Sequence, residues 1–159
     1  MKPRQDYPKL KRFESLEVTK SGVKVGDLYR EEGVGIFFTY DPVWLATGFN
    51  LSPFTMKFDD KPQLARAPEL FEGLHGPFAD SLPDGWGMLL MDRFLNATFG
   101  EGTAYTVTAL DRLAYMVYGP DTWLTGVRGH GGHFSAKPAS PGGHHALEHE
   151  RRHEPKTRV

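Results

Sequence analysis

The first half of the chain alternates apolar and polar residues with a period of two, which is the pattern of strands that bury one face. Two strands are expected on either side of a turn at residues 20–22, where Gly22 gives the turn its backbone freedom. A third strand is expected at residues 34–40, which are rich in β-branched and aromatic side chains, and a further one around residues 54–58. The alternating apolar residues of the first two strands are Leu16, Val18, Val23 and Val25.

Helical signals follow the strands. Asp41 as N-cap and Pro42 at the first helical position begin a short helical turn. Further helices are expected at residues 68–74, 78–82, 86–97 and 106–116. Because the strands precede the helices, the sequence predicts an α+β fold, in which a small antiparallel β-meander sheet is followed by packed short helices.

The expected helix at residues 86–97 carries more apolar surface than packing against one sheet requires. Its apolar side chains cover roughly 200° of the helical wheel, whereas one buried face needs a narrower stripe. Leu89 shares the remaining sector with the polar residues Asp92, Arg93 and Asn96. In the last helix, Asp111 and Arg112 are expected to point outward.

Composition divides the chain into three parts. Residues 1–12 form a basic N-terminal tail with a net charge of +4, residues 13–125 form the domain with −8, and residues 126–159 carry +3. The last part is rich in Gly and His and poor in large apolar residues, so we expect it to be a disordered tail. An acidic body disfavours direct binding of nucleic acid, whose affinity depends on Lys and Arg.

Two further observations place the chain in a broad class. The sequence contains no Cys, which excludes disulfides, thiolate zinc sites and cysteine nucleophiles and suits a reducing compartment. No apolar run approaches the roughly 20 residues that a membrane span requires. We therefore expect a cytoplasmic protein without membrane attachment.

Residues 23–116 resemble the N-terminal subdomain of HipA-family proteins, the serine/threonine kinase toxins of bacterial type II toxin–antitoxin systems. The most specific run is FADSLPDGWG at residues 78–87. The other matching runs are residues 25–28, 38–45, 51–53, 71–74 and 109–116. The resemblance implies a small antiparallel sheet followed by packed helices, and in the family this subdomain precedes the kinase core. The phosphate-binding loop, the catalytic Asp and the magnesium ligands of that core have no counterpart in this chain.

The resemblance implies two alternative functions. In split systems a small HipS-like protein supplies this subdomain and binds and inhibits a HipT-like kinase, beside a HipB-like helix-turn-helix protein. The chain then is a non-catalytic interaction domain that binds or regulates a HipA/HipT-like kinase, with no cofactor. Alternatively, it is an inactive N-terminal truncation of a full-length toxin kinase, and a reading-frame change in a GC-rich gene would produce the Gly, His, Arg and Pro of its end.

A third hypothesis is a metal-dependent hydrolase built on HERRH at residues 149–153. His149 and His153 would lie one turn apart, but Leu147 is the one large apolar residue near them and Pro155 ends the helix. A catalytic zinc ion also requires a third protein ligand, which the few residues after His153 do not supply. We therefore expect no catalytic metal site and, at most, adventitious binding by the His residues of this tail.

The body offers few groups for catalysis. His75 is expected to be a surface turn residue, and Asp84 is expected to cap the helix that Trp86 enters. Trp86 itself is either a core residue or an anchor at a protein interface, where Trp is the most enriched residue type. We expect no catalytic residue; the candidate partner interface consists of Ser81, Leu82, Pro83, Asp84, Trp86 and Leu90.

Overall fold

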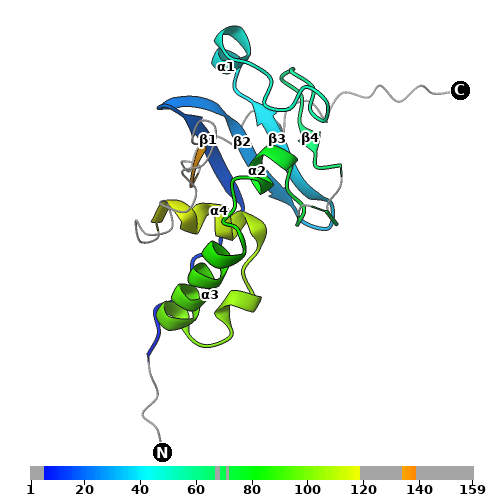
Figure 1. The fold of residues 1–159 in the computed structure, drawn as a ribbon. Coiled ribbons are helices and arrows are strands. Elements are labelled where there is room, and N and C mark those ends of the chain that lie inside the picture. Colours follow the sequence, from blue (N-terminus) through cyan, green and yellow to red (C-terminus); the bar gives the residue numbers. More distant parts are fainter. Residues whose placement is uncertain (1–5, 67–68, 71, 119–133, 139–159) are drawn as a thin grey trace, which may run out of the picture.

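The computed structural model describes residues 6–66, 69–70, 72–118 and 134–138 (Figure 1). The strands are β1 (Ser15–Lys20), β2 (Val23–Glu31), β3 (Gly35–Tyr40), β4 (Gln63–Leu64) and β5 (Phe134–Pro138). They form one antiparallel sheet in the order β4-β3-β2-β1-β5. The helices are α1 (Pro42–Thr47), α2 (Gly76–Ala79), α3 (Gly85–Phe99), the 3-10 helix η1 (Thr103–Tyr105) and α4 (Ala109–Tyr118). The predicted α+β fold, with its small antiparallel sheet and short helices, is confirmed.

The hairpin between β1 and β2 forms as expected from its turn residues. Lys20 pairs with Val23, so the two residues between them make the tightest connection that two antiparallel strands can have. Both have positive φ angles, 50° at Ser21 and 80° at Gly22, which suit a hairpin turn that follows the twist of the strands. Leu16 is fully buried on the inner face of this hairpin, which fixes its register.

The prediction of a strand around residues 54–58 is wrong. These residues form a compact turn in which the Ser52 carbonyl accepts hydrogen bonds from the Thr55 and Met56 amides, 3.1 and 2.8 Å long. Because local bonds already pair these amides, they are not available for a sheet ladder. The fourth strand instead follows as the two-residue β4, which pairs with Phe37 and Phe38 of β3.

Helices α3 and α4 lie at one end of the sheet, whereas α1 lies at the other end (Figure 1). Figure 1 shows α4 beside the sheet, with α3 extending away from it, and α4 contacts β1 and β5. Met91 and Leu95 of α3 and Leu110 of α4 are fully buried in the same core as the inner face of the sheet. The excess apolar surface of α3 is therefore covered in part by α4 and by the core side chains, rather than by the sheet alone.

The expectation that Asp111 and Arg112 point outward is wrong. Asp111 is 1% exposed, and with Thr108 it forms a reciprocal cap at the start of α4, each side chain accepting from the other's backbone amide at 3.0–3.1 Å. Asp111 also accepts hydrogen bonds from the Phe13 amide and the Arg12 guanidinium, both 2.9 Å long. Tyr115 exchanges two hydrogen bonds with the Lys11 backbone. Residues 11–12, expected to belong to a solvated tail, thus dock on α4.

The expected disorder of residues 126–159 does not hold for the whole segment. Residues 134–138 form β5, which pairs antiparallel with β1 from Leu16↔Pro138 to Lys20↔Phe134. The edge of β1 offers unpaired backbone groups, and an extended segment satisfies them without requiring a hydrophobic face of its own. The remainder of this tail, including the HERRH motif, lies outside the described residues, so its expected disorder stays a prediction.

Candidate interaction surface

The entry of α3 is a rigid turn, and its residues divide into structural and exposed ones. Asp84 caps the helix, its carboxylate accepting from the Gly87 amide at 3.1 Å, as expected. Pro83 is buried beneath this turn, and a Cβ at Gly87 would lie 2.7 Å from the Pro83 Cβ, so position 87 requires glycine. Ser81 is half-buried and donates a 2.9 Å hydrogen bond to the Pro77 carbonyl. Pro83 and Ser81 thus shape the turn and offer little contact surface themselves.

Trp86 stands out from this turn into solvent. Its side chain is 65% exposed, so it is not part of the hydrophobic core. Leu89, one turn further along α3, is 40% exposed and continues the apolar surface. Leu82 and Leu90 are half-buried and pack against the core, so they support the turn from below. The surface that the structure offers is therefore Trp86 with Leu89, supported by Leu82, Pro83 and Leu90.

Leu89 is missing from the set that the sequence indicated, although a signal was present. It is an apolar residue in the polar sector of the helical wheel, beside Arg93. In the structure both Leu89 and Arg93 are exposed, on the same stripe as Trp86. The sequence signal for Leu89 is therefore an apolar side chain in the polar sector of the helical wheel.

Polar contacts hold α3 firmly in place. The Arg112 guanidinium of α4 donates to Asp92 at 2.6 Å, to the Met88 sulfur at 3.0 Å and to the Ala104 carbonyl at 3.1 Å. The Asn96 side chain accepts from the Ala104 amide at 3.0 Å. Since these bonds tie α3 to both α4 and η1, the indole of Trp86 is presented on a fixed support.

The charge around this surface is negative. Asp80 and Asp84 are exposed next to the turn, and Glu101 is exposed beyond the other end of α3. The carboxylates of Asp92 and Asp111 are already paired with arginines. Arg93 is the one exposed cation among the described residues 72–116. The apolar stripe is therefore bordered at its N-terminal end by two carboxylates that form no ion pair with any described residue.

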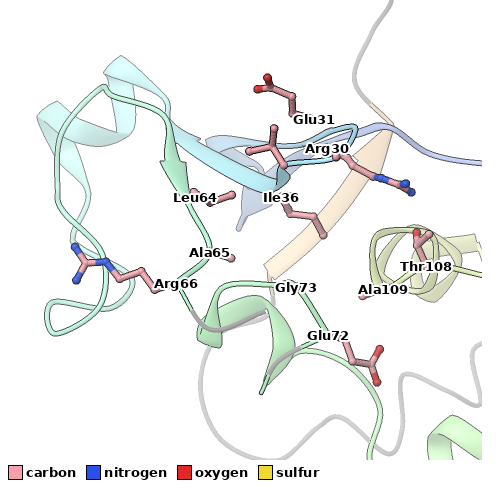
Figure 2. Close-up of a pocket in the computed structure, with 13 residues that line it drawn as sticks. Arg30, Glu31, Ile36, Leu64, Ala65, Arg66, Glu72, Gly73, Thr108 and Ala109 are labelled. Carbon is pink, nitrogen blue, oxygen red and sulfur yellow. The ribbon is translucent and has the colours of Figure 1, made fainter. Parts of the chain in front are cut away.

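A groove lies at the start of β3, where Gly35 and Ile36 line it. It has a volume of about 1080 Å³ and is bordered by the β2–β3 turn, β4, residues 72–73 and the start of α4 (Figure 2). Figure 2 shows that the side chains of Arg30, Arg66 and Glu72 point away from its middle. Thr108 lines the groove, and its hydroxyl group already accepts a hydrogen bond from the Asp111 amide. The described lining residues thus bring together no nucleophile with a base, and the groove gives no support to catalysis.

His75 is not the surface residue expected from the sequence. It is 7% exposed, and its ring packs beside the rings of Phe38 and Phe78, with centroids 6.2 and 6.0 Å away. Its Nε2 lies 2.9 Å from the Gln63 carbonyl, which requires the proton on Nε2. Nδ1 is buried with no hydrogen-bond partner among the described residues. Burial lowers the pKa of His75, and the bond to the Gln63 carbonyl opposes that shift.

We expect His75 to make the stability depend on pH. Because its pKa in the folded chain lies below the value of 6.5 in the unfolded chain, the unfolded chain takes up the proton first. The contribution of His75 to the free energy of unfolding is complete above pH 6.5. It is lost as the pH falls through 6.5 toward the pKa of His75 in the folded chain. His75→Gln keeps an N–H for the Gln63 carbonyl but does not titrate. Its melting temperature should fall less than that of the unsubstituted chain between pH 7.5 and 5, whereas equal falls would contradict the assignment.

The described residues contain neither a cluster of three His, Cys, Asp or Glu that could hold a metal ion nor a helix long and apolar enough to cross a membrane. The HERRH motif falls outside these residues, so the structure does not test the hydrolase hypothesis.

Comparison with known protein families identifies residues 16–121. The family model described as the HipA N-terminal domain matches residues 16–121, which is more than half of the chain and includes the sheet from β1 to β4, all the helices and the Trp86 turn. No curated protein and no solved structure matches the chain significantly. The match covers the runs on which the resemblance rested, and the chain belongs to the family of HipA N-terminal domains.

Proposed function

We propose that this chain is a non-catalytic interaction domain of a HipA-type toxin–antitoxin system, and that it binds and regulates a HipA/HipT-like serine/threonine kinase. The observation that carries the proposal is the 65% exposure of Trp86 on a helix that is fixed by hydrogen bonds. A large exposed indole on a rigid support supplies contact area at little entropic cost, and Trp is the residue type most enriched among binding hot spots. The family match supplies the toxin–antitoxin context.

The surface also indicates the chemistry of the partner. Trp86 and Leu89 require an apolar depression, and the carboxylates of Asp80 and Asp84 require positive charge beside it. A kinase face with an apolar pocket bordered by Lys or Arg would satisfy both. In this proposal a HipB-like helix-turn-helix protein joins the same assembly by binding the kinase.

The test is to co-express the chain with the HipA/HipT-like kinase encoded in the same genome, and to measure the affinity of the purified pair by calorimetry. We expect a one-to-one complex and a lower rate of kinase autophosphorylation. A chain that folds but binds no such kinase at micromolar concentrations would overturn the proposal and favour the inactive truncation.

Raising the salt concentration from 50 to 500 mM should weaken the complex about two- to fivefold, because exposed charges are screened. Asp80→Asn combined with Asp84→Asn removes two charges, while Asn at position 84 still caps α3. We expect this variant to lose most of the salt dependence and to melt like the unsubstituted chain. Unchanged salt dependence would show that the carboxylates lie outside the interface.

The chain alone should neither hydrolyse ATP nor transfer its phosphate in the presence of magnesium. The family match is to the N-terminal domain, and the groove at the start of β3 presents no catalytic pair among its described residues. The measurement is radiolabelled phosphate release and autophosphorylation with protein free of contaminating kinase. A rate above the buffer background would contradict the non-catalytic assignment.

A further inference from the structure

The exposed side of α3 is a narrow stripe that runs along most of the helix. Apart from Gly85, the exposed residues of α3 are Trp86, Leu89, Arg93 and Ala97. They follow one another at intervals of three and four positions, so at about 100° per residue they fall within roughly 80° of the helical wheel. At a rise of about 1.5 Å per residue, this α3 stripe is about 16 Å long. The buried residues Met91 and Leu95 lie on the opposite side, so the stripe faces away from the core.

The α3 stripe carries little charge for a surface that faces water. Asp92 and Arg93 are the charged residues of α3, and Asp92 is held by Arg112 of α4. Arg93 forms no ion pair with any described residue. The outer side of a surface helix ordinarily carries charged and polar residues, and a helix that is apolar all round is ordinarily buried. The stripe therefore has the composition of a surface that another protein covers, with a single cation along it.

Charges of opposite sign mark the two parts of the α3 stripe. Asp80 and Asp84 are exposed at its N-terminal end, next to Trp86. Arg93 lies about 13 Å further along the helix axis than Asp84, at about 1.5 Å per residue. A complementary surface therefore carries Lys or Arg opposite the two carboxylates, an apolar depression opposite Trp86 and Leu89, and an Asp or Glu opposite Arg93.

The width of the stripe indicates which element of a partner fits it. A helix that packs against a sheet or a broad core buries a face at least about 100° wide, whereas the seam between two helices is narrower. Residues three and four positions apart also form the ridge that fits into the groove of a second helix. The small side chain of Ala97 allows a second helix to approach closely at the C-terminal end of the stripe, while Trp86 supplies contact area at the other end.

We propose that the α3 stripe packs against one amphipathic helix of the HipA/HipT-like kinase, and that an Asp or Glu of that helix pairs with Arg93. This inference rests on the proposed function and names the element of the kinase that the chain recognises. The ion pair sets the register of the two helices, because sliding the partner by one turn, about 5.4 Å, separates its carboxylate from Arg93. Arg93 is thus a specificity-determining residue, whereas Trp86 supplies contact area.

Charge reversal tests the ion pair in the complex of the full chain with the kinase encoded in the same genome. Arg93→Glu should weaken binding at least about tenfold, because it places like charges opposite each other, whereas Arg93→Lys should bind within about threefold of the unsubstituted chain. The control is Arg30→Glu, which makes the same change of charge at an exposed arginine of β2 and should alter the affinity less than about twofold. All three variants should melt like the unsubstituted chain, because both arginines are exposed.

The close approach of a helix is tested at Ala97. Ala97→Trp places a large side chain on the stripe and should weaken binding about tenfold or more, since the two helix axes can no longer approach. The control, Ala46→Trp, makes the same change at an exposed alanine of α1 and should leave the affinity unchanged. Arg93→Lys also identifies the partner residue, because a carbodiimide joins an amine to a carboxylate in contact with it. We expect mass spectrometry to find position 93 linked to an Asp or Glu on a helix of the kinase.

The results separate this inference from the proposed function. If the kinase binds the unsubstituted chain, but binds Arg93→Glu and Ala97→Trp equally tightly, the stripe is not the interface and the inference fails while the proposed function stands. If position 93 is linked to a loop or strand of the kinase, or to no carboxylate of it, the helical partner is wrong. If the kinase does not bind the unsubstituted chain at all, the proposed function fails and the inference fails with it.

Discussion

Replacing Asp111 by alanine should lower the free energy of unfolding by about 2–4 kcal/mol, because a buried donor without an acceptor costs about 1–3 kcal/mol and a lost helix cap costs about 1 kcal/mol. The Asp111 side chain is 1% exposed, and its carboxylate accepts three hydrogen bonds, two from the backbone amides of Phe13 and Thr108 and one from the Arg12 guanidinium. Alanine leaves these donors without an acceptor and removes the reciprocal cap of α4.

Urea denaturation followed by tryptophan fluorescence measures this loss. The matched control is Asp27→Ala, which also removes an aspartate that pairs with a cation, but both side chains of its pair with Lys24 are more than a third exposed. We expect the control to cost about 1 kcal/mol, the usual upper value for an exposed ion pair. If the two variants were equally stable, the N-terminal segment would not be anchored on α4 through Asp111.

Replacing Trp86 by alanine should cost about 2–4 kcal/mol of binding to the kinase, roughly thirty- to several-hundredfold in affinity. Because the indole is 65% exposed in the free chain, the same substitution should change the free energy of unfolding by less than about 1 kcal/mol. A core tryptophan would behave in the opposite way, losing about 3–5 kcal/mol of stability. Calorimetric binding and thermal melting of one variant therefore separate the two roles.

Phe54→Ala is the matched control for Trp86→Ala. Phe54 is 98% exposed at the apex of the turn that follows α1, on a different element from α3, so its removal tests the loss of an exposed aromatic ring as such. We expect it to leave both affinity and melting unchanged. Equal losses of affinity in the two variants would show that the interface is not confined to the α3 entry, and normal affinity in Trp86→Ala would place the interface elsewhere.

Local patterns were enough to predict much of this fold. The hairpin turn at Ser21 and Gly22, the cap of α1 at Asp41 and the cap of α3 at Asp84 are encoded within a few neighbouring residues, and all three form as expected. The errors concern contacts between distant residues. The burial of Asp111 depends on Phe13, 98 positions away, and the burial of His75 depends on aromatic rings from β3 and α2.

The position of the candidate surface could be predicted from a local pattern, whereas the exposure of its individual side chains could not. The apolar width of α3 is visible on a helical wheel, so excess apolar surface at the Trp86 turn could be inferred from residues 86–97 alone. Which of these side chains remain exposed depends on how α4 packs against α3, and that packing uses Arg112, whose contacts lie 8 to 24 positions away. Pro83, which the sequence places in the candidate interface, is buried beneath the turn.

The docking of residues 11–13 on α4 has a consequence for how the chain folds during synthesis. The bonds from Lys11, Arg12 and Phe13 to Asp111 and Tyr115 join positions about a hundred residues apart, and closing so large a loop carries an entropic cost that local hairpins avoid. The hairpin of β1 and β2 has all its residues early, but the first segment of the chain has no docking partner until α4 has left the ribosome. A nascent chain that stalls before residue 111 should therefore remain sensitive to protease at its N-terminal end.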